Sequence, residues 1–130
     1  MCWLAGGVIS AKAKRQTTVA LSTCESEYVA IGAAAQEVIY LRQLLKDLHE
    51  PQEEPTVLLC DNNAARELTE KETHQQRTKH IAIRYHFVRE AVKRGELVVK
   101  RIDGKDNPAD LFTKPLPPIT FRKHLQSLFE

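Results

Sequence analysis

The chain has 130 residues, of which 42% are hydrophobic and 28% charged, a composition that predicts one globular domain over residues 1–130 and excludes a fibrous or disordered chain. Its three cysteines, Cys2, Cys24 and Cys60, are widely spaced, which excludes a disulfide framework and favours a reducing compartment. The net charge is +2, and no apolar run approaches the roughly 20 residues of a membrane-spanning helix, so we expect no membrane partner and no secretory signal.

The N-terminal third predicts β-structure followed by one long helix. Residues 2–7 predict a short strand ending at a Gly6-Gly7 turn, and a second strand follows, with a β-rich segment over 16–21. Ser22 and Glu25 have capping-box spacing and predict a helix over 23–49. Its apolar stripe comprises Ile31, Ala34, Val38, Leu41, Leu45 and Leu48, and Glu27 falls on the same stripe one turn earlier.

The remaining chain alternates strands and helices, which predicts an α/β fold. The sequence first predicts a strand over Thr56–Cys60 that is covered on both faces, followed by a helix over 64–71. A helix over 79–94, ended by Gly95, and a strand over 96–102 come next. The last two elements are a helix that begins at Pro108 and an amphipathic helix over 119–129, which is expected to dock through Phe121, Leu125, Leu128 and Phe129.

The small net charge hides two oppositely charged segments. Residues 24–55 contain seven acidic and two basic side chains, whereas residues 71–101 contain nine basic and three acidic ones. The basic segment favours a polyanion such as nucleic acid as partner, although a solvated charged face gives the same pattern.

Three carboxylates occupy similar places in the predicted elements. Glu27 lies in the first turn of a helix, Asp61 directly after a strand, and Asp110 at the start of a helix. Carboxylates at such positions bind hard cations such as Mg²⁺, and paired ions assist phosphodiester cleavage. Each also has a simpler interpretation, Asp61 as a helix N-cap and the other two as first-turn acids. Cys60, in an apolar run, is interpreted as a core residue.

Five segments together resemble the C-terminal ribonuclease H domain of copia-type LTR retrotransposon polyproteins (reverse transcriptase/RNase H). They are KRQTTVALSTCESEY at 14–28, CDN at 60–62, QRTKHI at 76–81, RYHFVRE at 84–90 and NPADLFTKPL at 107–116. The resemblance covers approximately residues 2–116, and residues 117–130 are expected to form a C-terminal helix beyond it.

This resemblance implies an RNase H-like fold, a mixed sheet flanked by helices, and endonucleolytic cleavage of the RNA strand of RNA–DNA hybrids. It implies two Mg²⁺ (or Mn²⁺) ions held by four carboxylates, three of which match Glu27, Asp61 and Asp110. It also implies an intracellular location, in the cytoplasm, the nucleus or virus-like particles.

The family's fourth carboxylate lies on a strand that precedes the segment matching residues 2–7. We therefore expect an N-terminally truncated fold, weak metal binding and impaired activity in this chain alone. The missing strand is central in the family, so we also expect unpaired sheet edges, resolved by a homodimer or by a rearranged sheet.

Nucleic-acid contacts are expected from Arg77, Lys79, His80 and Arg84. The alternative to a nuclease is a catalytically silent RNase H-like module that binds nucleic acid or a partner protein.

Overall fold

A computed structural model describes residues 1–13, 23–61 and 79–128, with the backbone alone for 23–25 and 79–81. The chain divides into two compact units, one made of residues 18–101 and one made of residues 1–17 and 102–130. No helix among the described residues is long and apolar enough to cross a membrane. The predicted β-rich segment 16–21, the cap at Ser22 and the helix over 64–71 lie outside the described residues.

The chain begins with a β-hairpin made of β1 (Cys2–Leu4) and β2 (Gly7–Ser10). Ala5 and Gly6 form its two-residue turn with φ values of 49° and 82°. Positive φ at both positions is the geometry that suits the twist of two antiparallel strands. The predicted strand and tight turn are confirmed, but the strand ends at Leu4 because the turn uses Ala5 and Gly6 rather than Gly6 and Gly7.

Helix α1 (Thr23–Asp47) confirms the predicted long helix. Its buried side chains, Tyr28, Ile31, Ala35 and Val38, recur at steps of three and four. Beyond the last helical residue, Asp47, the residue His49 adopts a left-handed backbone conformation with φ 65°. The backbone amides of His49 and Glu50 donate to the carbonyls of Lys46 and Leu45, so the last turn is closed before Pro51.

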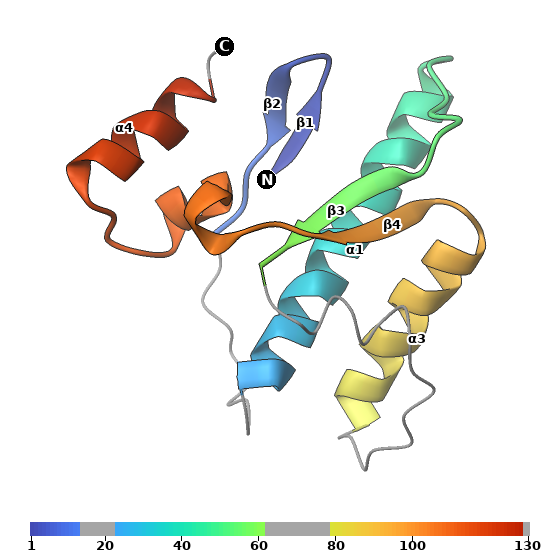
Figure 1. The fold of residues 1–130 in the computed structure, drawn as a ribbon. Helices are drawn as coiled ribbons and strands as arrows, with labels where there is room; N and C mark the ends of the chain where they lie inside the picture. Colours follow the sequence, from blue (N-terminus) through green and yellow to red (C-terminus); the bar gives the residue numbers. More distant parts are fainter. Residues whose placement is uncertain (14–22, 62–78, 129–130) are drawn as a thin grey trace. The chain divides into compact units, whose positions relative to one another are not determined.

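Strands β3 (Thr56–Cys60) and β4 (Leu97–Arg101) form a parallel pair (Figure 1). Each contacts a helix, β3 with α1 and β4 with α3 (Lys79–Lys93). Leu58, Cys60, Leu97 and Val99 are buried, whereas Val57 and Leu59 are about half exposed. The prediction that Thr56–Cys60 is covered on both faces was therefore wrong, because the buried side chains alternate along β3 and one face remains open in the described structure.

Helix α3 packs against α1 within the same unit. Tyr85 and Tyr28 meet edge to face, with ring centroids 6.0 Å apart and an interplanar angle of 82°. The helix ends as predicted at Gly95, which has φ 72°, and the amide of Glu96 donates to the carbonyl of Ala91.

The C-terminal part contains two short 3₁₀ helices, η1 (Gly104–Asp106) and η2 (Pro108–Phe112), followed by α4 (Pro118–Gln126). Asn107 caps η2, because its side-chain oxygen accepts the amide hydrogen of Ala109 at 3.1 Å. The predicted docking face of α4 is contradicted at Phe121 and Leu125, which are exposed, whereas Leu128 is half-buried and Phe129 lies outside the described residues. His124 is buried instead, and α4 contacts η2.

The described residues thus form an α/β structure with three α-helices, an antiparallel strand pair and a parallel strand pair. The α/β class predicted from the sequence is confirmed. The single mixed sheet of an RNase H-like fold stays a prediction.

Candidate functional site

Glu27 is positioned by the packing of the helix turn that carries it. The next residue, Tyr28, is buried against Tyr85 of α3, and Ile31 one turn later is 3% exposed. These contacts fix the N-terminal half of α1, and Glu27 beside them is half-buried. Its carboxylate is therefore held near the strand pair rather than rotated freely into solvent.

Cys60 and Asp61 are positioned by the end of β3. Cys60 is the last residue of the strand and is 6% exposed, and Asp61 follows it and is half-buried. The parallel register with β4 fixes this end of the strand, since Cys60 is paired with Arg101. Ligands in α/β proteins bind at the carboxyl ends of parallel strands, which is where Asp61 lies.

The structure brings these three side chains together. One carboxylate oxygen of Glu27, one of Asp61 and the Sγ atom of Cys60 all lie within 4.8 Å of one another. We call this group the Glu27–Cys60–Asp61 cluster. Within the described ranges it is the one group of three or more potential metal-ligating side chains. The proximity of Glu27 and Asp61 is what the sequence led us to expect, and their role as ligands stays a prediction.

The carboxylates of the cluster fit Mg²⁺. This ion prefers oxygen ligands and is commonly held by one or two carboxylates together with water and substrate phosphate oxygens. Two carboxylates this close also repel each other, so a cation between them is favoured electrostatically. The sulfur of Cys60 does not suit Mg²⁺, because thiol ligands select softer metals.

Arg101 lies beside the cluster by strand register. In β4, Leu97 and Val99 face the buried side, and alternation along the strand places Arg101 on that same face and Lys100 on the opposite one. Arg101 is the register partner of Cys60 and is exposed. An exposed guanidinium at this position can bind a phosphate oxygen of a substrate.

Asp110 belongs to the other unit. It lies in η2 and is 8% exposed, and the Nζ atom of Lys114 lies 3.0 Å from each of its carboxylate oxygens. This ion pair satisfies the carboxylate, which agrees with the simpler interpretation of Asp110 as a first-turn acid of a helix. A role as metal ligand requires Lys114 to move away.

The nucleic-acid residues expected from the sequence are described only in part. Arg77 lies outside the described residues, and for Lys79 and His80 only the backbone is described. Arg84 is half-buried, and its Cβ, Cγ and Cδ atoms lie against Gly32 of α1. Arg89 places its guanidinium 5.6 Å from the ring centre of Tyr85.

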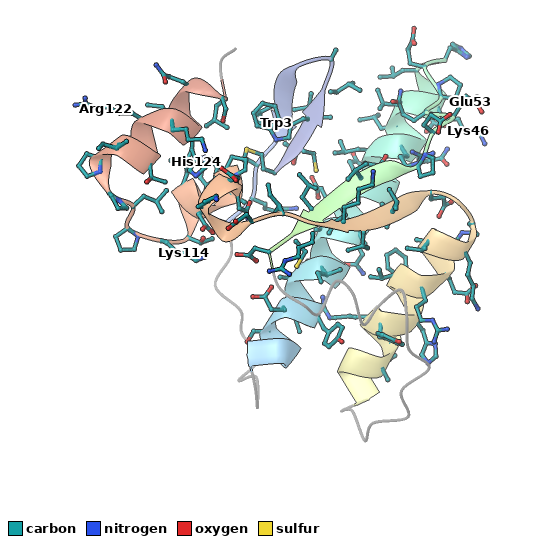
Figure 2. The ribbon with its side chains drawn as sticks, viewed as in Figure 1. Trp3, Lys46, Glu53, Lys114, Arg122 and His124 are labelled. Atoms are coloured by element: carbon teal, nitrogen blue, oxygen red, sulfur yellow. The ribbon has the colours of Figure 1, made fainter. Side chains whose placement is uncertain are left out.

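A hydrogen bond between α4 and η1 changes the pKa of an acidic side chain in the unit made of residues 1–17 and 102–130. The Nζ atom of Lys123 donates to Asp106 at 2.6 Å, and this hydrogen bond lowers the pKa of Asp106 below its ordinary value. Figure 2 shows His124 on the side of α4 that faces η2 and Arg122 pointing away from it. The Nε2 atom of His124 is buried with no hydrogen-bond partner among the described residues.

Two residues at the cluster, Cys60 and Arg101, were not predicted from the sequence as parts of a site. Cys60 was interpreted as core, and its burial is confirmed, but its Sγ atom also faces the two carboxylates. Arg101 had a sequence signal, because the predicted strands at 56–60 and 96–102 are nearly equal in length. If the two strands are paired in parallel from their first residues, their last residues lie side by side, and Arg101 comes next to Cys60.

Comparison with known proteins finds relatives among transposon polyproteins. The chain is 43% identical over 112 residues, 86% of its length, to the retrovirus-related Pol polyprotein from transposon TNT 1-94 of Nicotiana tabacum. It is 36% identical over 114 residues to the corresponding polyprotein from transposon RE2 of Arabidopsis thaliana. It is 29% identical over 122 residues to the transposon Ty1-NL2 Gag-Pol polyprotein of Saccharomyces cerevisiae.

The chain spans 8% of the length of each of the two plant polyproteins and 7% of the yeast one. No family model and no solved structure matches it.

Proposed function

Because this chain is related to a segment of retrotransposon Pol polyproteins, we propose that it is their RNase H-like segment and that it cleaves the RNA strand of RNA–DNA hybrids. In this proposal Glu27 and Asp61 hold Mg²⁺ or Mn²⁺, and Asp110 stays a further ligand that the resemblance alone implies. When bound, the cations supply charge neutralisation at the scissile phosphate and orient the attacking water. The resemblance to copia-type elements implies a fourth carboxylate, which in those elements lies on a strand before the matching region.

The observation that carries this proposal is the proximity of Glu27 and Asp61. Their carboxylate oxygens, from a helix and from the end of a parallel strand, lie within 4.8 Å of each other. Two carboxylates that share one cation, with room for phosphate and water ligands, are the arrangement that metal-assisted phosphodiester hydrolysis requires.

The surrounding charges support a polyanionic substrate. Arg101 lies beside the cluster by register, and Arg84 is held against α1 in the same unit. Backbone phosphates of a hybrid are recognised by such side chains without reading the base sequence. Binding of this kind weakens steeply as the salt concentration rises.

A second candidate function is a binding module without catalysis. It is favoured by the Lys114–Asp110 ion pair, because Lys114 contacts both oxygens of the third proposed ligand. In this case hybrid binding persists but no cation-dependent cleavage follows.

The test compares two proteins with a labelled RNA–DNA hybrid. One is the 130-residue chain, and the other is the same chain joined to the residues that precede the matching region in the tobacco polyprotein. We expect Mg²⁺-dependent RNA cleavage by the joined protein and little by the chain alone. Asp61→Asn and Glu27→Gln should each lower the rate by about 100-fold or more, because each removes an anionic ligand of the cation that neutralises charge in the transition state.

The control is Asp47→Asn, an exposed acid at the other end of α1, which should leave cleavage unchanged. A folded joined protein that binds the hybrid but does not cleave it contradicts the nuclease and supports the binding module. Cleavage that survives Asp61→Asn contradicts the proposed site.

A further inference from the structure

The cysteine of the Glu27–Cys60–Asp61 cluster has no use in a Mg²⁺ site, yet its Sγ atom lies among the ligand atoms. We propose that the cluster is also a binding site for a thiophilic divalent cation, Zn²⁺ or Cd²⁺, with Cys60 Sγ as a direct ligand beside the two carboxylates. Such a cation occupies the same carboxylates as Mg²⁺ and so excludes it. The exclusion of Mg²⁺ as a form of inhibition rests on the proposed function, whereas the binding itself does not.

The geometry of the cluster suits a tetrahedral site. With ordinary Zn–S and Zn–O bond lengths, tetrahedral ligand atoms stand about 3.3–3.6 Å apart. The three atoms in the structure lie within 4.8 Å of one another, so a ligand pair must close by at most about 1.2–1.5 Å to reach that spacing. Both carboxylates are half-buried. A water molecule completes the fourth position.

The chemistry of the donors selects for soft cations. A thiolate ligand favours Zn²⁺ and Cd²⁺ strongly over Mg²⁺, and two carboxylates provide the additional negative charge. The thiol gives up its proton when it binds the metal, so binding releases one proton to the solvent and strengthens as the pH rises. Cys60 is 6% exposed, and in such a desolvated place the attraction between thiolate and cation is stronger than in water.

The competing interpretation is that Cys60 is only a small core residue. Packing of β3 against α1 and β4 accounts for its burial, but packing alone makes no prediction about metals. The two interpretations therefore differ in one measurable property. A core cysteine leaves the cation preference of the carboxylates unchanged, whereas a ligand cysteine changes it.

The test is a titration of the chain with Cd²⁺, followed through the ultraviolet charge-transfer absorption of a thiolate bound to Cd²⁺. Cys2→Ser and Cys24→Ser are introduced first, because the sequence has 3 cysteines and this background leaves Cys60 as the single thiol. We expect the band to saturate at one Cd²⁺ per chain. Asp61→Asn and Glu27→Gln keep the thiol and should each weaken Cd²⁺ affinity about 10-fold or more.

Two controls keep the result interpretable. Cys60→Ser should abolish the band, and Cys60→Val, which keeps an apolar side chain of similar volume, does the same if the serine variant fails to fold. Excess Mg²⁺ should shift the Cd²⁺ titration to higher concentrations in the background protein. Where the joined protein cleaves hybrids, Zn²⁺ should inhibit it less in Cys60→Ser than in its parent.

A folded background protein that shows no band contradicts the proposal, whatever its nuclease activity. A band that is unaffected by both acid substitutions also contradicts it, because the thiol then binds Cd²⁺ without the cluster. Absence of cleavage together with an acid-dependent band contradicts the proposed function alone.

Discussion

Gly32 of α1 lies directly against Arg84 of α3. A β-carbon added at Gly32 would lie 3.1 Å from the Cβ atom of Arg84 and 3.3 Å from its Cγ atom. Because the Cβ atom is fixed to the backbone of α3, it cannot move aside by a change of rotamer. The glycine therefore sets the spacing between α1, which carries Glu27, and α3, which carries the basic side chains.

Gly32→Val should separate the two helices and destabilise the 18–101 unit by about 1–3 kcal/mol, the usual cost of overpacking. Gly32→Ala should be nearly neutral, because a helix-propensity gain of about 1 kcal/mol offsets a smaller clash. Urea denaturation gives both values. Ala33→Val, at the adjacent exposed position, is the matched control, and an equal loss in that variant would refute a role for close packing.

Arg101→Ala should weaken binding to an RNA–DNA hybrid more than Lys100→Ala does. Both residues are exposed and basic, but strand alternation places only Arg101 on the face of the cluster. The binding is measured by fluorescence anisotropy in an Asp61→Asn background, which keeps the hybrid intact. Loss of one phosphate contact should also reduce the slope of the logarithm of the affinity against the logarithm of the salt concentration by about 1. Equal effects of the two substitutions would show that only total charge matters.

Arg42→Ala should destabilise the connection between α1 and β3. The Nη1 atom of Arg42 donates to the carbonyl of Glu54 at 2.8 Å and to Oγ1 of Thr56 at 2.9 Å, and its Nη2 atom donates to the carbonyl of Gln52 at 2.6 Å. Removing these charge-assisted bonds should cost about 1–3 kcal/mol in the free energy of unfolding.

Arg42→Lys should recover only part of that loss, since an ammonium group does not reproduce the planar fork. Gln43→Ala, which loses one exposed hydrogen bond to Asp47, serves as the control and should change stability far less. If the Arg42→Ala variant is as stable as the parent protein, other contacts hold the segment between α1 and β3.

The contact between α4 and η1 should weaken in acid. Lys123 lowers the pKa of Asp106, so the ion pair stabilises the folded state above the ordinary aspartate pKa of about 4 and loses this contribution as the pH falls through the lower folded value. Asp106→Asn should remove this pH dependence. Thermal unfolding of parent and variant between about pH 2 and pH 7 tests it, and parallel curves would exclude the ion pair as the cause.

Periodic patterns in the sequence predicted most of the helices and strands. Apolar residues spaced three and four positions apart identified α1. Gly95 identified the end of α3, because a residue with a left-handed backbone conformation is needed there. The open face of β3 could not be predicted, since a run such as Thr56–Cys60 is equally apolar in strands covered on one face or on both. The burial of His124 was missed for a related reason, because a lone polar residue in a short helix gives no periodic signal.

A site residue could be predicted where its position in a helix or strand determines the direction of its side chain. Glu27 follows from its place on the apolar stripe and Asp61 from its place at a strand end, and the structure brings the two together. Cys60 and Arg101 required the strand register, which depends on pairing between residues far apart in the chain. The Lys114–Asp110 pair has helical spacing, but many pairs with that spacing form no contact.

In the site that we propose, the Glu27–Cys60–Asp61 cluster also links the stability of this segment to the supply of cations. Its acids come from distant parts of the chain and meet only after α1 has docked onto β3. A cation that binds the docked form alone would therefore hold the helix in place. On this proposal, chelation of divalent ions should loosen α1.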